Sequence, residues 1–265
     1  MKKALLIILA YGILFCACII EKSEPQVSGL LFKTQYYNGD SAYQRDFLVY
    51  DYKGFSQIPL VTINKETIGL YDQSVNWYEY YDENLILTNK DYELIVSHAD
   101  GSATAKIAMP NNFRIISPDT NYTMGRDSSL VIVWQKSAKA SWYWLDYYIS
   151  YEYLDTAGEW DSYDFEKDTV LTDTFCRFAV GRFFPYYVVN ILDGEGEANV
   201  WAMDGPKIYP GSKGNVSGQG IGFFNAANEG PDAYFYLVTP PAHRHLYKKD
   251  DSREKIKNKL LSLRP

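Results

Sequence analysis

The stretch SWYWLDYYISYEY, residues 141–153, places two tryptophans and five tyrosines within thirteen residues. Because side chains alternate between the two faces of a strand, this segment is predicted to be a strand with two different faces. Asp146, Ser150 and Glu152 favour water, so their face is expected to be the outer one. The core face is then expected to carry Tyr143, Leu145, Tyr147, Ile149, Tyr151 and Tyr153.

The same alternation places three large rings on the expected outer face. Exposed aromatic side chains in a row usually mark a contact surface. Packing against a preceding domain, whose stretch Asn76–Asn84 is also aromatic, is the favoured interpretation, since interdomain surfaces are common. The alternative is a platform for sugar rings, which present apolar C–H faces to indole. The candidate binding face therefore comprises Trp142, Trp144 and Tyr148, with Trp77 and Tyr80 as contributors across the junction.

The chain opens with MKKALLIILAYGILFCAC, residues 1–18. Lys2 and Lys3 precede an apolar segment of the length of a signal-peptide core, whereas a membrane-spanning helix needs roughly 20 apolar residues. Ala17 directly before Cys18 resembles the cleavage signal of bacterial lipoproteins, although Phe15 and Cys16 depart from that signal. The resemblance implies a signal peptide over residues 1–17 and lipid attachment at Cys18, in the cell envelope and on the outer membrane. Ordinary secretion and an uncleaved anchor are the alternatives.

The charge balance limits the classes of partner. Without residues 1–17 the chain has 24 Lys and Arg against 33 Asp and Glu, a net charge of −9. Nucleic-acid binding needs a positive surface, so no nucleic-acid partner is expected. With Cys18 lipidated, Cys176 is the remaining thiol, so no internal disulfide is expected, and Cys176 is interpreted as a small buried hydrophobe.

Period-two alternation in the first half predicts short strands and an N-terminal β-sandwich-like domain over residues 18–112. The clearest feature is a hairpin of residues 91–98 and 103–110 around Asp100-Gly101. Its inward side chains are expected to be Tyr92, Leu94 and Val96 on one arm and Ala105, Ile107 and Met109 on the other. The remaining candidate strands are residues 29–37, 46–52, 58–64, 76–81 and 84–89.

A second block, residues 113–240, resembles a fibronectin type III-like domain. The stretches SLVIVW (129–134), YYISYEY (147–153) and YYVVNILDGEGEA (186–198) are similar to the B, C and F strands of that family. The family buries a tryptophan on strand B, matched by Trp134, and ends strand F in a turn, matched by Asp193-Gly194. The resemblance covers residues 113–225 and implies a β-sandwich. The insertion at residues 155–175 departs from the family pattern.

The whole layout also resembles two-domain envelope lipoproteins of Bacteroidetes-type bacteria. The matching pieces are Thr104–Pro110 and the glycine-rich GNVSGQGIGFF, residues 214–224. Membership implies a surface or periplasmic lipoprotein without an assigned reaction.

The last segment, residues 241–265, is basic. Asp251 and Glu254 suit a helix start, and Ile256, Leu260 and Leu263 recur at helical spacing. A short amphipathic helix over residues 252–263 is therefore predicted. One interpretation is docking on a partner or an anionic membrane surface. The favoured interpretation is a helix packed on its own domain, or a frayed terminus.

Local chemistry motifs do not indicate catalysis. Gly218, Gly220 and Gly222 lack the strand–helix context of a nucleotide site, and His243 and His245 lack a third ligand nearby. We therefore expect an all-β protein of two sandwich-like domains and a C-terminal helix, with no cofactor and no metal. Its expected role is non-catalytic: binding, adhesion or assembly, with a glycan or an envelope protein as partner. The alternatives are a β-sandwich carbohydrate-active hydrolase and a structural subunit of an envelope complex.

Overall fold

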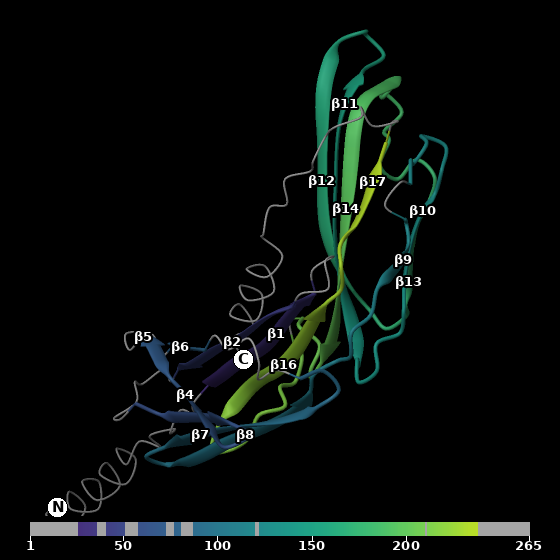
Figure 1. The fold of residues 1–265 in the computed structure, drawn as a ribbon. Coiled ribbons are helices and arrows are strands. Elements are labelled where there is room, and N and C mark those ends of the chain that lie inside the picture. The colour runs from purple at the N-terminus through teal and green to yellow at the C-terminus, as the bar shows by residue number, and fades with distance from the viewer. Residues whose placement is uncertain are drawn as a thin grey trace, which may run out of the picture.

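Over the residues that the structure describes, the chain is all-β, as the sequence predicts. In a computed structural model the described residues form seventeen strands and no helix (Figure 1). The described residues are 26–35, 41–50, 58–72, 77–80, 87–119, 122–209 and 211–237, without the side chains of residues 35, 41–50, 71, 72, 77, 79 and 80.

A nine-stranded sheet runs through the whole molecule. Its order is β12-β11-β14-β16-β1-β2-β6-β5, with β17 also paired to β14. The fifteen-residue β14 pairs with β17 through Glu195–Ala198 and with β16 through Trp201–Asp204, so one strand joins both halves of the sheet. The strands are β1 (Gln26–Gln35), β2 (Ser41–Tyr50), β5 (Leu70–Asp72), β6 (Trp77–Tyr80), β11 (Trp142–Leu154), β12 (Trp160–Leu171), β14 (Asn190–Asp204), β16 (Ile221–Glu229) and β17 (Ala233–Tyr236).

Two smaller sheets cover opposite ends of the large one. A three-stranded sheet, β13-β10-β9, packs against the end that holds β11, and a five-stranded sheet, β15-β8-β7-β3-β4, packs against the end that holds β1 (Figure 1). Their strands are β3 (Leu60–Ile63), β4 (Glu66–Ile68), β7 (Asp91–His98), β8 (Gly101–Ala108), β9 (Ile115–Ser117), β10 (Leu130–Trp134), β13 (Phe175–Phe178) and β15 (Ser217–Gly218).

The second sandwich has fibronectin type III-like strand order. Its sheets β9-β10-β13 and β12-β11-β14-β17 correspond to strands A-B-E and C′-C-F-G. Strands B and C are predicted correctly, and Trp134 is buried in the shared core. Two details are wrong. Asp193-Gly194 lies inside β14 rather than in a turn, and residues 160–171 of the supposed insertion form β12, which pairs with β11 from Tyr143 to Leu154.

The first sandwich encloses a separate core. Alternating residues of β1, β3, β7, β8 and β16 meet there, and the inward sets predicted for the β7–β8 hairpin are buried. The hairpin loop is Ala99-Asp100, and Gly101 begins β8 with φ at +143°. The candidate strand at residues 84–89 is wrong over its described part, since residues 87–89 form a loop and turn.

The sheets do not divide at residue 112. Strand β1, from the first half of the chain, lies between β2 and β16, and it runs parallel to β16. Where β1 and β16 meet, a Cβ on Gly222 would lie 1.9 Å from the Val27 carbonyl oxygen, and the φ of Gly222 is +138°. The glycine-rich segment therefore allows the close approach of β1 and β16 rather than forming a binding loop.

Candidate functional site

The aromatic strand β11 has the core face that the alternation predicts. Tyr143, Leu145, Tyr147, Ile149, Tyr151 and Tyr153 are all buried in the second sandwich. Burial raises the pKa of Tyr147 to about 12, and the hydroxyl of Tyr151 donates to the Phe183 carbonyl oxygen at 2.6 Å. These rings serve the architecture and are closed to a ligand.

Two rings of the expected outer face are also buried. Trp142 is 1% exposed and Trp144 is 2% exposed, so the prediction that they stand outside the core is wrong. They share a hydrophobic cluster with Leu30 and Phe32 of β1, and the Trp142 Nε1–H donates to the Gly205 carbonyl oxygen at 2.9 Å. These two rings therefore pack with β1, a strand from the first half of the chain, and a contact with the aromatic stretch Asn76–Asn84 stays a prediction.

The other predicted site residues have different outcomes. Tyr148 is 38% exposed, and its hydroxyl donates to Asp164 Oδ1 at 2.9 Å. Trp77 and Tyr80 lie in β6, but the structure does not describe their side chains. Cys18 and the whole of residues 241–265 lie outside the described residues. A ligand contact by Tyr148, Trp77 or Tyr80 stays a prediction.

Beyond the two tryptophans, the outer face of β12, β11 and β14 is acidic. Register partners share a face, so Asp146 lies between Asp168 and Asn199, Tyr148 between Glu166 and Glu197. No lysine or arginine is on this face from the row of Asp146 to the row of Glu152 within these three described strands. We call this surface the acidic face: Asp146, Glu152, Asp164, Glu166, Asp168, Asp193, Glu195 and Glu197.

Burial and mutual repulsion act on this surface. Burial raises the pKa of the Glu195 carboxyl, and it is the largest cause of the raised pKa of Tyr148. Asp146 is itself buried, directly opposite Asp168, and like charges in register destabilise a sheet. The acidic face therefore favours a partner that brings positive charge.

A second candidate surface is the free end of the second sandwich, which we call the distal tip (residues 154–161 and 185–190). Here β11 ends, β12 begins and β14 begins, because Leu154 pairs with both Trp160 and Asn190 (Figure 1). Trp160 is 66% exposed, Tyr186 89% and Val189 54%. The alternation of 141–153 could not reveal this surface, since Tyr186 lies outside any strand and Trp160 lies in the segment taken for an insertion.

The distal tip is rigidly built beneath its exposed rings. Asp155 Oδ1 accepts the N–H groups of Ala157 at 2.8 Å and Glu159 at 2.9 Å, which fixes the turn before Trp160. The Val189 N–H donates to the Leu154 carbonyl oxygen at 2.8 Å. Tyr186 stands edge-on to Tyr187, with ring centroids 5.6 Å apart. Large exposed rings on a fixed frame are typical of a contact surface.

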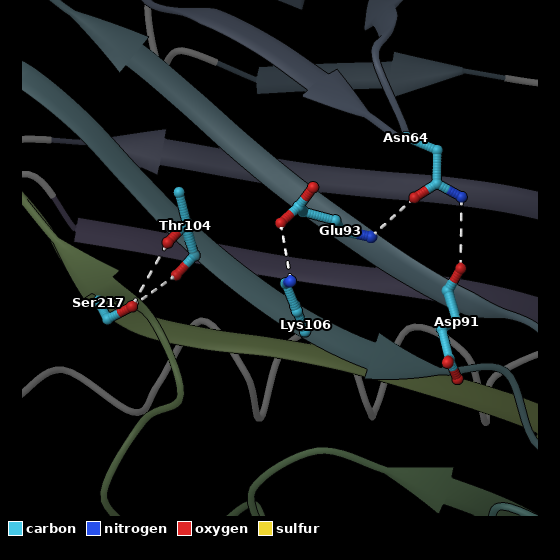
Figure 2. Close-up of polar contacts among 6 residues, drawn as sticks. All are labelled: Asn64, Asp91, Glu93, Thr104, Lys106 and Ser217. Atoms are coloured by element: carbon cyan, nitrogen blue, oxygen red, sulfur yellow. Dashed lines mark hydrogen bonds and ion pairs between the residues drawn. The ribbon is translucent and has the colours of Figure 1, made fainter.

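Polar residues on the outer face of the five-stranded sheet and its turns contact one another, as Figure 2 shows. Asn64 accepts the Glu93 N–H at 2.9 Å and donates to the Asp91 carbonyl oxygen at 3.3 Å, so it ties the β3–β4 turn to β7. Glu93 pairs with Lys106 at 3.1 Å, and the Ser217 hydroxyl lies 3.3 Å from the Thr104 carbonyl oxygen. These contacts fix strand register and do not converge on a binding centre.

Within the described part of the chain, the residues considered for chemistry are not gathered into a centre. Cys176 is half-buried against the second core, and burial raises the pKa of its thiol. His98 Nε2 lies 2.8 Å from the Gln219 carbonyl oxygen. Among the described residues, no group of three or more His, Cys, Asp and Glu side chains is placed to hold a metal ion, and no helix is long and apolar enough to cross a membrane.

No protein-family model matches the chain, and no curated protein sequence matches it. Among solved structures, the chain is similar to the fibronectin(III)-like modules of Clostridium thermocellum CbhA, with 10% identity over 83% of this chain and 100% of the other, at a TM-score of 0.23. It is also similar to Yersinia pseudotuberculosis InvD, with 12% identity over 80% of this chain and 68% of the other, at a TM-score of 0.21. At these scores neither similarity carries an argument, and the strand order above rests on the hydrogen-bonded pairs alone.

Proposed function

We propose that this chain is a lipid-anchored, non-catalytic binding protein of the bacterial cell envelope, and that its distal tip binds a glycan. The observation that carries the proposal is the exposure of Trp160 and Tyr186 at the same end of one sandwich. Indole and phenol rings held open to solvent offer stacking surfaces for the apolar C–H faces of sugars.

The acidic turn at the distal tip supplies the polar half of such a site. Glu159 is exposed directly before Trp160, and Asp161 follows it with Oδ2 3.1 Å from the Tyr153 hydroxyl. Ionised carboxylates accept hydrogen bonds and therefore suit the hydroxyl groups of a sugar. A neutral or amino-bearing glycan fits this combination, whereas a polyanion does not.

The position of the distal tip agrees with an anchor at the N-terminus. Cys18 precedes the start of β1 at Gln26 by eight residues. In Figure 1, β1 lies in the first sandwich, and the β11–β12 hairpin forms the opposite end of the molecule. A lipid on Cys18 would hold the first sandwich next to the membrane and leave the distal tip facing away from it.

The binding half is tested with a glycan array and polysaccharide pull-down on residues 23–265. We expect retention of wild type and loss in Trp160→Ala/Tyr186→Ala. The matched control is Ile116→Ala/Phe175→Ala, which removes two other exposed apolar side chains, 56% and 53% exposed, at the other end of the sandwich. A wild-type chain that retains no glycan or polysaccharide would overturn the choice of ligand.

The anchor is tested separately in a bacterial host. Metabolic labelling with an alkyne fatty acid should mark the full-length chain and not Cys18→Ser. A labelled Cys18→Ser chain, or an unlabelled wild type, would contradict lipid attachment at this residue.

A further inference from the structure

The acidic face continues directly into a buried aromatic cluster. Trp144 and Trp201 are register partners one row from Asp146 and Asn199, and Trp201 pairs in turn with Glu229 of β16. We call this set the seam cluster: Leu30, Phe32, Trp142, Trp144, Trp201, Met203, Ile208, Phe223 and Ala227. The outer face of the large sheet is thus apolar at the seam and acidic above it.

A sheet cannot bury its own face. Every member of the seam cluster is at most 5% exposed, yet within the described part of the chain Ile208 is the one member that lies outside the nine-stranded sheet. Ile208 is too small to cover four strands. The seam cluster and the adjoining acidic face therefore require a cover that is apolar at one place and cationic at another.

A buried polar atom on this face indicates what the cover carries. Asn199 is 9% exposed, its Nδ2 donates to Glu197 Oε1 at 3.0 Å, and its Oδ1 is buried without a hydrogen-bond partner among the described residues. An acceptor set among carboxylates needs an N–H donor, and a cationic side chain supplies one.

We propose that the cover is the chain's own C-terminal segment, residues 241–265. This segment has eight Lys and Arg against three Asp and Glu, a net charge of +5, whereas residues 1–240 have 18 against 30, a net charge of −12. Its Ile256, Leu260 and Leu263 recur at helical spacing among the lysines. The lysines suit the acidic face, and the apolar stripe suits the seam cluster.

The position and length of the segment allow this docking. Strand β17 ends at Tyr236, in register with Glu195 of the acidic face, so the chain leaves the described fold beside its binding surface. The path from Glu195 to Met203 along β14 is roughly 26 Å at ~3.3 Å per residue. The residues after Leu237 could span about 90 Å if extended, which is ample for a turn at Pro240-Pro241 and a return along β14.

The first test uses the full-length chain and zero-length carbodiimide coupling of amines to carboxylates. Peptide mapping should find Lys255, Lys257 or Lys259 joined to Glu166, Asp168 or Glu195. A mixture of ¹⁴N- and ¹⁵N-labelled protein separates coupling within one chain from coupling between two. Coupling of these lysines to other surfaces only, or only between isotopically different chains, would overturn the proposal.

The second test asks whether the carboxylates hold the segment. Trypsin should cleave after Lys248 to Lys259 at least five-fold faster in Asp164→Asn/Glu166→Gln/Asp168→Asn than in wild type, and faster in wild type as salt rises from 0.05 to 0.5 M. The control Glu66→Gln/Asp91→Asn/Glu93→Gln removes three carboxylates from the other sandwich and should cleave as wild type does. Equal rates in all three proteins would contradict docking on the acidic face.

Discussion

Trp144 of β11 and Trp201 of β14 lie directly opposite each other, and the ring centroids of Trp201 and of Phe32 in β1 are 4.4 Å apart. Because β11 and β14 belong to the second sandwich and β1 to the first, these three rings join the two halves of the molecule. The burial of Trp144 and Trp201 is therefore a structural requirement of the seam.

Truncation of this seam should be costly. We expect Trp201→Ala to lower the free energy of unfolding by about 3–5 kcal/mol, the usual cost of removing a buried aromatic side chain. Urea denaturation followed by circular dichroism measures it. Trp160→Ala at the distal tip is the matched control and should change stability by about 0.5 kcal/mol or less. Equal costs for the two variants would contradict the assignment of Trp160 to a contact surface.

Gly196 should not tolerate a side chain. It faces Phe235 of β17, and a Cβ there would lie 2.2 Å from the Phe235 ring. We expect Gly196→Ala to destabilise the second sandwich by about 1–3 kcal/mol, since overpacking forces strands apart. Gly69→Ala, with no atom within 4 Å of the added Cβ, is the control in the same thermal-unfolding series. Similar melting temperatures for both variants would show that β17 does not pack as described.

The β3–β4 turn can be improved. Asn64 and Lys65 both have positive φ, at 49° and 72°, which is the two-residue hairpin conformation that prefers glycine at its second position. Lys65→Gly should therefore raise stability by about 0.5–1 kcal/mol. Lys106→Gly, in the middle of β8, should lower it instead. Denaturation midpoints that move in the same direction for both variants would refute this reading of the turn.

Stability should fall in alkali because of buried tyrosines. Burial raises the pKa of Tyr78 to about 12, and its hydroxyl donates to the Pro59 carbonyl oxygen. The native state holds the Tyr78 proton more tightly than the unfolded state does. The contribution of Tyr78 to the free energy of unfolding is therefore complete below pH 10 and is lost as the pH rises towards 12. Urea denaturation between pH 9 and 12 should show the decline, and Tyr78→Phe should show a shallower one. If stability falls equally steeply with pH in the wild type and in Tyr78→Phe, Tyr78 is not the cause of the decline.

The sequence predicts well where one face of a strand keeps one environment. The β7–β8 arms and the core face of β11 alternate regularly, and each inward side chain there is buried. The outer face of β11 changes environment along its length, from the seam cluster at Trp142 and Trp144 to the acidic face at Glu152. Alternation is a local signal. Because Asp146, Ser150 and Glu152 are polar, it assigns the whole outer face of β11 to solvent.

Glycine within β14 misleads in a similar way. Asp193-Gly194 has the composition of a turn, yet a Cβ on Gly194 would lie 2.5 Å from Tyr151 Cβ. The glycine is needed for close packing beside a large ring in the neighbouring strand. Such a need depends on which strands pair across long stretches of chain, and residue composition around position 194 does not report it.

The account depends most on the distal tip as a glycan-binding surface, and isothermal titration with a glycan retained on the array tests it directly. We predict that Trp160→Ala/Tyr186→Ala weakens binding at least ten-fold, about 1.4 kcal/mol, while Ile116→Ala/Phe175→Ala leaves the dissociation constant unchanged. Both variants should unfold at the wild-type temperature. Unchanged affinity in the tip variant, or a wild-type chain that binds no glycan, would contradict the central claim.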